Sequence, residues 1–441
     1  MTRDDQRITV GDYVTLVRGT TYKGQLVGAP GPALLGLGSI EPGGGFRIGH
    51  YKTYGGNCPV ELMLFPGDIY ASLKGATKDG KMIGSVARVP PSVSTGRLTQ
   101  DTVKLVFRNP NPEDARFLHW VLRTPHYRQY CAGHAMGSAV VALSRRDFLA
   151  YPVPRPTAKR REIVVLLDAI EERIELNRRM NETLEAMARA IFKSWFVDFD
   201  PVRAKAECRR PAWMDAKTTA LFPNSFEESE IGVIPKGWRV RPIGEAARVV
   251  GGSTPSTEKP AFWHGSISFV TPKDMAALTA PVLLETERTI TESGLAEIGS
   301  GLLPKGTVLL SSRAPIGYLA ITEIPVAVNQ GFVAMVCDGA VPNHYGLHWV
   351  RENLDTIIGN ANGTTFLEIS KKNFRPIPVL MPPADVLDAF VRVAAPLHQR
   401  VVSNLRESHT LAALRDALLP KLISGELRVS QGVCISVGAP V

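Results

Sequence analysis

Several features are missing from this 441-residue sequence. No run of eighteen apolar residues occurs, so no membrane-spanning helix is predicted. The first residues, MTRDDQRITVGDYV, lack the apolar core of a signal peptide. The five cysteines form neither a CxxC pair nor a Cys/His zinc pattern: Cys58, Cys131, Cys208, Cys337 and Cys434. We therefore expect free thiols in a cytoplasmic protein, with no membrane partner and no metal site.

Signatures of catalysis are also missing. The stretch 75–82 is close to a P-loop, but Met82 replaces the hydroxyl residue that binds magnesium, which favours a basic hairpin turn. The stretch 109–112, NPNP, lacks the aromatic residue that adenine methyltransferases place after Asn-Pro-Pro. The tripeptides 79–81 and 215–217 match the Asp-x-Lys of nucleases only loosely, and such short matches occur by chance. The sequence therefore predicts no catalytic residue and no cofactor bound by this chain.

What the sequence does contain is a long stretch, 158–197, without proline or glycine. Its apolar residues recur in alternating steps of three and four, as in the seam of a coiled coil. Asn177 and Asn181 interrupt the seam. Either these amides fix the register of a helix pair, or Asn177 lies at the seam edge and faces water. Trp195 and Phe196, at the end of the stretch, are interpreted as core residues.

A second stretch with such apolar spacing, 384–427, lies near the C-terminus. The two stretches align with an offset of 227, which pairs Asn177 with Asn404 and Leu184 with Leu411. Each stretch follows a proline-rich, strand-like segment. We therefore predict a tandem duplication in which two long helices pair antiparallel.

The regions before the two helices also repeat. Both are rich in glycine, proline and short β-like runs, with a helix expected at about 113–129 in the first. LFPGDIYAS at 64–72 matches LLPKGTVLLS at 302–311, and LSRRDF at 143–148 matches ISKKNF at 369–374. These patterns predict an α+β protein: two mixed α/β units, an antiparallel coiled coil of two long helices, and pseudo-twofold symmetry.

The net charge of +9 is uneven along the chain. The two long helices are nearly neutral, so the excess of lysine and arginine lies on the remaining segments. Excess positive charge on globular units fits a polyanionic partner such as DNA. A basic protein that never touches nucleic acid fits the same charge, so this observation alone leaves both possibilities open.

Five stretches carry a resemblance to a known family: LSRRDFLAYPVPRPTAKRREIVVLLDAIEERIELNRRMNETLEAMARAIFKSWFVDFDP, IGVIPKGW, SSRAPIGYLAI, VNQGF and ALRDALLPKLISGEL. From about residue 10 to 428 the chain resembles the DNA-specificity subunit of type I restriction–modification systems. The resemblance implies two target-recognition domains, each reading half of a bipartite site in double-stranded DNA. It also implies helices that set the gap and dock two modification subunits, with restriction subunits joining through the complex.

This resemblance implies that the chain itself performs no chemistry. Adenine methylation belongs to partners that use S-adenosylmethionine, and translocation and cleavage belong to partners that use ATP and Mg²⁺. The predicted domains are target-recognition domain 1 (1–156), the central helix (157–198), a linker (199–237), target-recognition domain 2 (238–383), the C-terminal helix (384–428) and a tail (429–441).

Candidate DNA contacts follow from residue chemistry. Arginine and lysine suit guanine and phosphate, asparagine and glutamine suit adenine, and small hydroxyls suit either. The candidates in the first unit are Lys74, Lys78, Lys81, Thr99, Gln100, Ser138, Arg145 and Arg146. Those in the second are Thr271, Lys273, Ser312, Arg313, Asn329, Gln330, Thr364, Lys371 and Lys372. The basic pairs 145/146 and 371/372, expected to precede strands, suit phosphates better than bases.

Two alternatives remain from the sequence. One is an enzyme whose catalytic half carries no recognisable motif; the carboxylates of Asp68 and Asp79, with Lys81, leave a nuclease open. The other is a coiled-coil assembly protein that never binds DNA.

Overall fold

The computed structural model describes residues 8–75, 80–137, 141–363 and 367–425. The chain divides into two compact units, unit 1 (Met1–Ile174 with His409–Val441) and unit 2 (Glu175–Ser408). The division passes through both long helices, α5 (Ala158–Phe196) and α14 (Ala384–Ser424), so each helix contributes to both units. Within the described ranges, no helix is long and apolar enough to cross a membrane.

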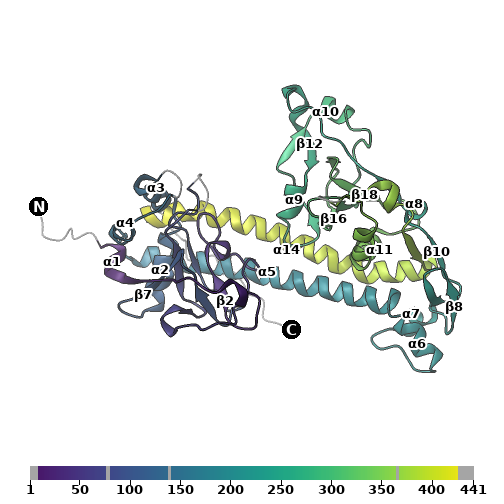
Figure 1. The fold of residues 1–441 in the computed structure, drawn as a ribbon, viewed down its shortest axis with the longest axis horizontal. Coiled ribbons are helices and arrows are strands. Elements are labelled where there is room, and N and C mark those ends of the chain that lie inside the picture. Colours follow the sequence, from purple (N-terminus) through teal and green to yellow (C-terminus); the bar gives the residue numbers. More distant parts are fainter. Residues whose placement is uncertain (1–7, 76–79, 138–140, 364–366, 426–441) are drawn as a thin grey trace, which may run out of the picture. The chain divides into compact units, whose positions relative to one another are not determined.

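The long helices pair antiparallel within each unit, as predicted (Figure 1). In unit 1, Arg160 near the start of α5 donates to the carbonyl oxygens of Leu422 and Ile423 near the end of α14, at 3.1 and 2.6 Å. In unit 2, the Asn404 amide donates to Asn181 Oδ1 at 2.8 Å, and the Asn177 amide donates to the Asn404 carbonyl at 3.4 Å. Residues that the repeat alignment makes equivalent therefore lie against each other.

This contact decides between the two interpretations of Asn177. Its side chain is fully buried and that of Asn181 is 4% exposed, so Asn177 does not face water. The Asn177 amide also donates to Glu407 Oε2 at 3.0 Å and to Ser408 Oγ at 3.3 Å. A buried polar layer of this kind favours one helix register over others.

The body of unit 1 is built around a four-stranded antiparallel sheet in the order β1 (Val14–Arg18), β7 (Thr102–Phe107), β4 (Ile69–Ser72), β5 (Val86–Arg88). Apolar side chains of this sheet and of α2 (Pro112–Val121) and α3 (Pro125–His134) form one core with Leu167 of α5 and Leu422 of α14. A smaller sheet has the order β2 (Ala33–Leu35), β6 (Gly96–Leu98), β3 (Met63–Leu64). The remaining helical turns are α1 (Val10–Tyr13), η1 (Gly24–Leu26), η2 (Leu37–Ser39), η3 (Val60–Leu62) and α4 (Arg145–Ala150).

The body of unit 2 repeats this plan. Its main sheet has the order β11 (Arg248–Val250), β18 (Phe332–Val336), β15 (Val308–Ser311), β16 (Leu319–Thr322), β13 (Val282–Leu283). The register repeats as well, because Ser311 pairs with Phe332 at one end of the sheet as Ser72 pairs with Thr102 in unit 1. The helices are α8 (Ile243–Ala246), α11 (Asn343–Glu352), α12 (Leu354–Gly359) and α13 (Lys371–Phe374).

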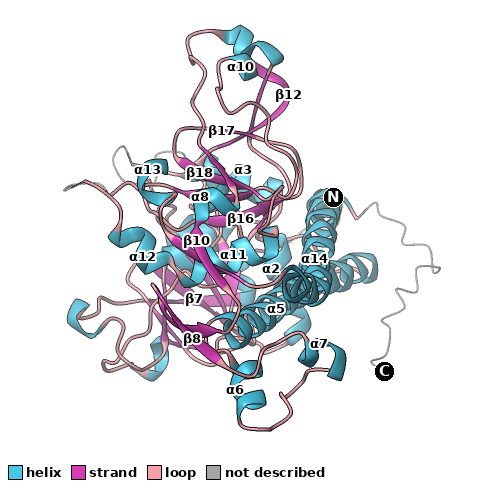
Figure 2. Cartoon of the chain, turned by 90° about the vertical axis from the view of Figure 1, so that its right-hand side faces the viewer, coloured by secondary structure: helices cyan, strands magenta, loops and turns pink. Residues whose placement is uncertain are grey.

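A second sheet in unit 2 has the order β14 (Arg288–Ile290), β12 (Trp263–Val270), β17 (Ala327–Val328). Figures 1 and 2 both show that β12 and α10 (Glu292–Ala296) extend beyond the sheet of β16 and β18, and we call residues 255–279 and 284–302, which leave out β13, the arm. The arm also contains η4 (Pro260–Phe262) and α9 (Pro272–Ala276). Its partner strand β17 pairs parallel to β12, as β6 pairs parallel to β2 in unit 1.

One glycine in each unit shows how closely the repeat is kept. A Cβ at Gly19 would lie 1.9 Å from the Thr99 carbonyl oxygen, and one at Gly252 would lie 1.7 Å from that of Val328. No side chain fits at either position, because the neighbouring backbone occupies the space. The sequence match of Gly19-Thr20-Thr21 with Gly252-Ser253-Thr254 therefore has a steric cause.

Two local predictions were wrong, and the segment called a linker proves to be folded. The single helix expected at about 113–129 is two helices, because Thr124 caps a new helix that has Pro125 in its first turn. The basic pairs 145/146 and 371/372 begin the short helices α4 and α13, capped by Ser144 and Ser370, and do not precede strands. The linker folds into α6 (Asp200–Ala206), α7 (Ala216–Ala220) and a hairpin of β8 (Phe226–Ser229) and β9 (Gly232–Pro235).

The folded linker packs into the core of unit 2. Trp195 and Phe196 are 8% and 5% exposed, and their rings meet Phe222 and Trp238 at centroid distances of 5.2 and 6.0 Å. Their interpretation as core residues is confirmed. The core also includes β10 (Arg239–Pro242) and β19 (Pro378–Met381), which pair antiparallel directly before α14.

Candidate nucleic-acid interface

The predicted contact residues of unit 2 gather at one edge of its body. Strand ends meet there. The backbone N–H of Asn329 donates to the Val270 carbonyl at 3.2 Å, and the backbone N–H of Ser312 donates to the Gly331 carbonyl at 2.8 Å. The Ile369 amide donates to the Ser312 carbonyl at 3.0 Å, which brings in the segment before α13. We define edge 2 as residues 252–254, 271–273, 312–313, 329–330 and 371–372. All candidates of this unit lie on it except Thr364, which is outside the described residues.

Most long polar side chains of edge 2 are exposed and only weakly held. Lys273 pairs with Glu287 at 2.6 Å, and Arg313 pairs with Glu368 at 3.5 Å; both ion pairs are at the surface. Exposed pairs of this kind contribute little to stability, so an incoming phosphate can displace them at small cost. Gln330 is exposed and accepts from Thr254 Oγ1 at 2.6 Å. Edge 2 therefore presents cations and an amide that are available to a polar ligand.

Two shorter side chains of edge 2, those of Thr271 and Asn329, hold the edge together, and a third, that of Ser312, lies beneath it. Ser312 is 2% exposed, so its hydroxyl cannot reach a ligand directly. Thr271 caps α9 by donating to Asp274 Oδ2 at 2.6 Å, and Asn329 Oδ1 accepts from the Gly331 amide at 2.9 Å. The direct contact expected of Ser312 is corrected to a supporting role, because the residue lies beneath the surface.

Unit 1 has the equivalent edge. The Leu143 amide donates to the Leu73 carbonyl at 2.9 Å, which repeats the Ile369–Ser312 bond of unit 2. We define edge 1 as residues 19–22, 73–74, 81, 99–101 and 144–146. The structure places six candidates of this unit on it: Lys74, Lys81, Thr99, Gln100, Arg145 and Arg146. Lys78 and Ser138 lie outside the described residues.

The side chains of edge 1 differ in availability. Gln100, Lys81, Arg145 and Arg146 are exposed, and Lys74 reaches Asp101 at 3.3 Å. Thr99 is only 8% exposed, because it packs against Gly36. Its direct contact is therefore corrected, as for Ser312: the Thr99 backbone joins the edge while its hydroxyl faces the interior.

The sequence did not single out a hollow beside edge 1. It has a volume of about 630 Å³, and its lining includes Tyr22, Arg47, Tyr51, Lys52 and Gln100. Aromatic faces next to cations suit a base and a phosphate, respectively. Apart from Gln100, these residues lie where the two repeats disagree, so a comparison of the repeats does not point to them.

The arm of unit 2 carries another group that the sequence did not reveal. The Arg288 guanidinium lies 3.7 Å from the centroid of the Trp263 ring, an arrangement that holds the cation in place. Arg288 is exposed, and the backbone N–H of its strand neighbour Glu287 donates to Oδ1 of Asp274, the residue after Lys273 of edge 2, at 2.8 Å. Arg288 is therefore displayed close to edge 2.

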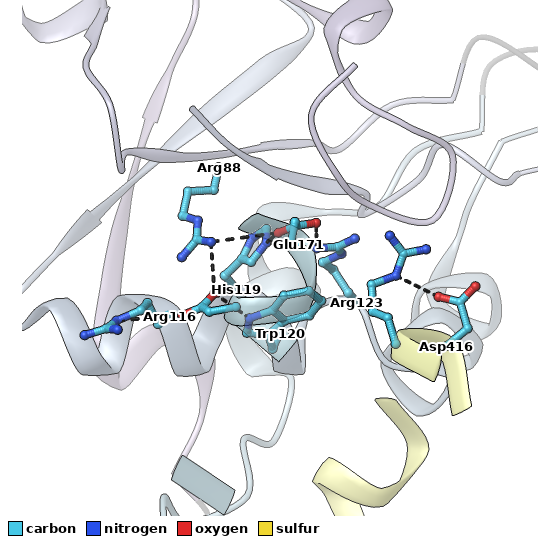
Figure 3. Close-up of polar contacts among 9 residues, drawn as sticks. Arg88, Arg116, His119, Trp120, Arg123, Glu171 and Asp416 are labelled. Atoms are coloured by element: carbon cyan, nitrogen blue, oxygen red, sulfur yellow. Dashed lines mark hydrogen bonds and ion pairs between the residues drawn. The ribbon is translucent and has the colours of Figure 1, made fainter. Parts of the chain in front are cut away.

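A polar junction fixes the body of unit 1 to α5 (Figure 3). Arg88 Nη2 and the Trp120 indole N–H both donate to Asp168 Oδ1 at 2.9 Å. Arg123 Nη1 donates to Glu171 Oε1 at 2.7 Å while its guanidinium lies 4.3 Å from the centroid of the Trp120 ring. We call these residues, with His119 and Arg116, junction 1. The two carboxylates come from the helix and the cations come from the body.

The charges of junction 1 follow from burial and proximity. Burial lowers the pKa of His119 to about 4, so the ring is neutral near pH 7. Burial alone would raise the pKa of Glu171, but the Arg123 guanidinium and the His119 ring hold it well below its usual value. Glu171 is therefore ionised and paired at neutral pH.

Unit 2 fixes its body to the helices through other residues. Glu323 of the body contacts His398 of α14 at 3.0 Å and Lys305 at 2.8 Å. Glu185 of α5 lies 3.6 Å from Arg351, and burial raises the pKa of Glu185 to about 7. We call these residues junction 2. Among the residues that the structure describes, no group of three or more histidine, cysteine, aspartate and glutamate side chains could hold a metal ion.

Comparisons with known proteins agree with this architecture. Residues 235–389 match the family described as "Type I restriction modification DNA specificity domain". A crystal structure of a type I restriction–modification S subunit from M. genitalium shares the fold, with a TM-score of 0.55 at 14% identity over 96% of this chain and 98% of that one.

Two curated relatives carry the same description. The MjaIX specificity subunit of Methanocaldococcus jannaschii is 39% identical over 163 residues, or 36% of this chain and 38% of that protein. The HindI specificity subunit of Haemophilus influenzae is 25% identical over 308 residues, or 60% of this chain and 66% of that protein. The matches thus span less than two thirds of either relative. The chain is therefore similar to type I restriction–modification specificity subunits, and residues 235–389 match the model of their DNA specificity domain.

Proposed function

We propose that the chain is a sequence-specific DNA-binding subunit in which edge 1 and edge 2 each read one half of a bipartite site. The observation that carries this proposal is the repeated register, which places the same strand ends and the same basic helix start on both edges. Because the exposed side chains differ between the edges, the two half-sites differ in sequence.

Each edge combines two kinds of contact. The cations at the starts of α4 and α13 are exposed and suit phosphates, which position a protein on the duplex without reading it. Gln100 and Gln330 are exposed at equivalent places and offer both a donor and an acceptor, which suits an adenine. Phosphate contacts therefore supply affinity, and the residues in which the edges differ supply selectivity.

The long helices have two roles in this proposal. They set the gap between the half-sites, and they dock two modification subunits. Equivalent positions 187 and 414 support the second role, because Met187 and Leu414 are 48% and 45% exposed although both are large and apolar. Exposed apolar side chains at matching places suit two copies of the same partner.

The chemistry belongs to the partners. Modification subunits would bring S-adenosylmethionine for adenine methylation, and restriction subunits would bring ATP and Mg²⁺ for translocation and cleavage. The chain directs both reactions by choosing the sequence and performs neither.

The first test is methylation mapping in cells that carry this subunit with its modification subunits. We expect a bipartite motif with two unlike halves and a fixed gap. A map without a bipartite motif would overturn the proposal, and methyl transfer by the purified chain alone would overturn its non-catalytic role.

A second test addresses the edges directly. Binding of a randomised DNA duplex is measured against salt for the double variant Arg145→Ala/Arg146→Ala and for Arg108→Ala. Arg108 is a control of the same residue type in the same unit, located after β7 at the opposite end of that strand. We expect the double variant to bind all sequences about tenfold more weakly, with a salt slope smaller by about 2. An unchanged slope would show that this helix start does not contact phosphates.

A further inference from the structure

A buried arginine lies directly beneath edge 1. Arg97, the middle residue of β6, is 3% exposed. Its Nη2 donates to Thr20 Oγ1 at 3.1 Å and to the Thr21 carbonyl at 3.0 Å. Within the described part of the chain, Arg97 has no carboxylate partner and its Nε has no hydrogen-bond partner. The guanidinium therefore binds Thr20 and Thr21 of edge 1, and no carboxylate of the described residues neutralises its charge.

A tyrosine pair completes this support. The Arg97 guanidinium lies 5.1 Å from the centroid of the Tyr54 ring, and the Tyr22 ring meets Tyr54 edge-on at 5.9 Å. The Tyr54 hydroxyl accepts from the Lys23 amide at 3.3 Å. Residues 20–23 are therefore tied to Arg97 and Tyr54 from below, while Thr20, Thr21 and Tyr22 are exposed above. Tyr22 also lines the hollow beside edge 1.

Unit 2 shows that the fold does not require a cation at this place. The equivalent strand residue is Ala327, which lies opposite Phe269 as Arg97 lies opposite Leu34. Ala327 packs into an apolar cluster with Trp263 and Phe269. The counterpart of Thr21, Thr254, is held instead by Gln330 at the surface. Burying a cation without a carboxylate costs free energy, so Arg97 must serve something that Ala327 does not.

We propose that Arg97 is a positioning residue for DNA recognition by unit 1. It holds residues 20–22 as a fixed wall of the hollow, where Tyr22, Gln100, Arg47 and Lys52 meet a nucleotide of the bound duplex. The selectivity of unit 1 for its half-site then depends on a side chain that does not touch DNA. This inference rests on the proposed function, and it predicts no such dependence for unit 2.

The test compares Arg97→Lys with Arg108→Lys in the full chain. Both substitutions keep the charge and remove the guanidinium fork, but Arg108 lies at the other end of β7 and donates to the Gly11 carbonyl there. Each protein selects sequences from a randomised duplex library in the presence of the modification subunits. Hydrogen exchange at residues 20–23 is measured on the same samples without DNA.

For Arg97→Lys we expect discrimination at one half-site to fall about tenfold while the other half-site stays as selective as in the unaltered chain. Amide protection at residues 20–23 should fall too, and the salt slope should stay the same because the charge is kept. Arg108→Lys should match the unaltered chain in all three measurements. A general loss of stability would weaken both half-sites together, so the half-specific loss separates positioning from simple unfolding.

Two results would overturn the proposal: full selectivity at both half-sites in Arg97→Lys, or equal loss at both. If Arg97→Lys fails to fold, Tyr54→Leu removes the other support of residues 20–23 and should give the same half-specific loss; full selectivity there would also overturn it. Failure of the proposed function looks different, because the unaltered chain would then select no bipartite sequence at all.

Discussion

Junction 1 and junction 2 hold equivalent bodies on the long helices, and at one pair of equivalent helix positions their chemistry is exchanged. The offset of 227 that pairs Asn177 with Asn404 also pairs Glu171 with His398. At this position unit 1 has a helix carboxylate that meets Arg123 of the body, and unit 2 has a helix imidazole that meets Glu323 of the body. The acidic residue thus lies on the helix in unit 1 and on the body in unit 2, although the two units share a fold.

This exchange shows what the junctions do beyond adding stability. If the bodies were exchanged, Glu323 of the unit 2 body would face the Glu171 carboxylate at this position, whereas Glu185 and Arg351 of junction 2 keep the sign found in junction 1. Like charges at a close contact cost free energy, and the observed arrangement avoids that cost at this position. The two junctions therefore favour one assignment of bodies to helix segments in a chain whose two halves otherwise share a fold.

The largest expected effect breaks junction 1. Glu171→Gln removes the carboxylate that Arg123 and His119 contact, and Arg123 is only 5% exposed at its side chain. Leaving a buried cation unpaired should destabilise unit 1 by about 3 kcal/mol. The equivalent His398→Gln should cost about 1 kcal/mol, since a neutral hydrogen bond is lost. Hydrogen exchange resolved by unit measures both losses, and equal losses would contradict the exchange of chemistry described here.

A smaller expected effect is a pH dependence of the stability of unit 2, which arises from Glu185 of junction 2. Burial raises the pKa of Glu185 to about 7 in the folded chain, above the ordinary value of 4.5, so the protonated form is favoured on folding. The stability this gives is present below pH 4.5 and is lost as the pH rises through 7. Glu185→Gln should therefore stabilise unit 2 by about 1–2 kcal/mol at pH 8 and by almost nothing at pH 4.

Chemical denaturation at the two pH values measures this difference. Unit 1 is an internal reference, because its position equivalent to Glu185 is Ala412, which has no carboxyl group. The stability of unit 1 should therefore not rise in Glu185→Gln at either pH. A gain of the same size at both pH values would mean that Glu185 is not the titrating group.

The smallest expected effect concerns the places where the two halves agree. Met187→Ser and Leu414→Ser change exposed side chains, so each should alter stability by less than about 0.5 kcal/mol. If these positions dock modification subunits, each change should still weaken assembly measured by analytical ultracentrifugation. Lys193→Ser, on the same helix and exposed, is the matched control. Unchanged assembly in both variants would move the docking surface elsewhere.

The parts of the fold that the sequence predicted are those with long or repeated signals. Heptad spacing identified α5 and α14, and the offset of 227 aligned Asn177 with Asn404, two residues that the structure brings into contact. The matched segments at 64–72 and 302–311 end at Ser72 and Ser311, which the structure places at the same point of equivalent sheets. Periodicity and self-similarity carry this information because many residues contribute to each.

The candidate site was predicted less completely. Thr99 and Ser312 were expected to contact a ligand, yet both are buried, because a hydroxyl residue at a strand end can face inward as easily as outward. Arg97 gave no signal, since burial of an arginine in β6 depends on Tyr54 and Thr20, which are far from it in sequence. The hollow beside edge 1 likewise forms from segments that only the folded chain brings together.

Because each long helix contributes to both units, the order of synthesis on the ribosome affects when unit 1 can be completed. Unit 1 includes Leu418 and Leu422 of α14, which pack with Ile163 and Leu167 of α5. Both leucines are synthesised only after all of unit 2 (Glu175–Ser408). Until then, the apolar face of α5 in unit 1 stays uncovered in the nascent chain. A chain that ends before Ala384 lacks the α14 segments of both units, so neither unit is complete.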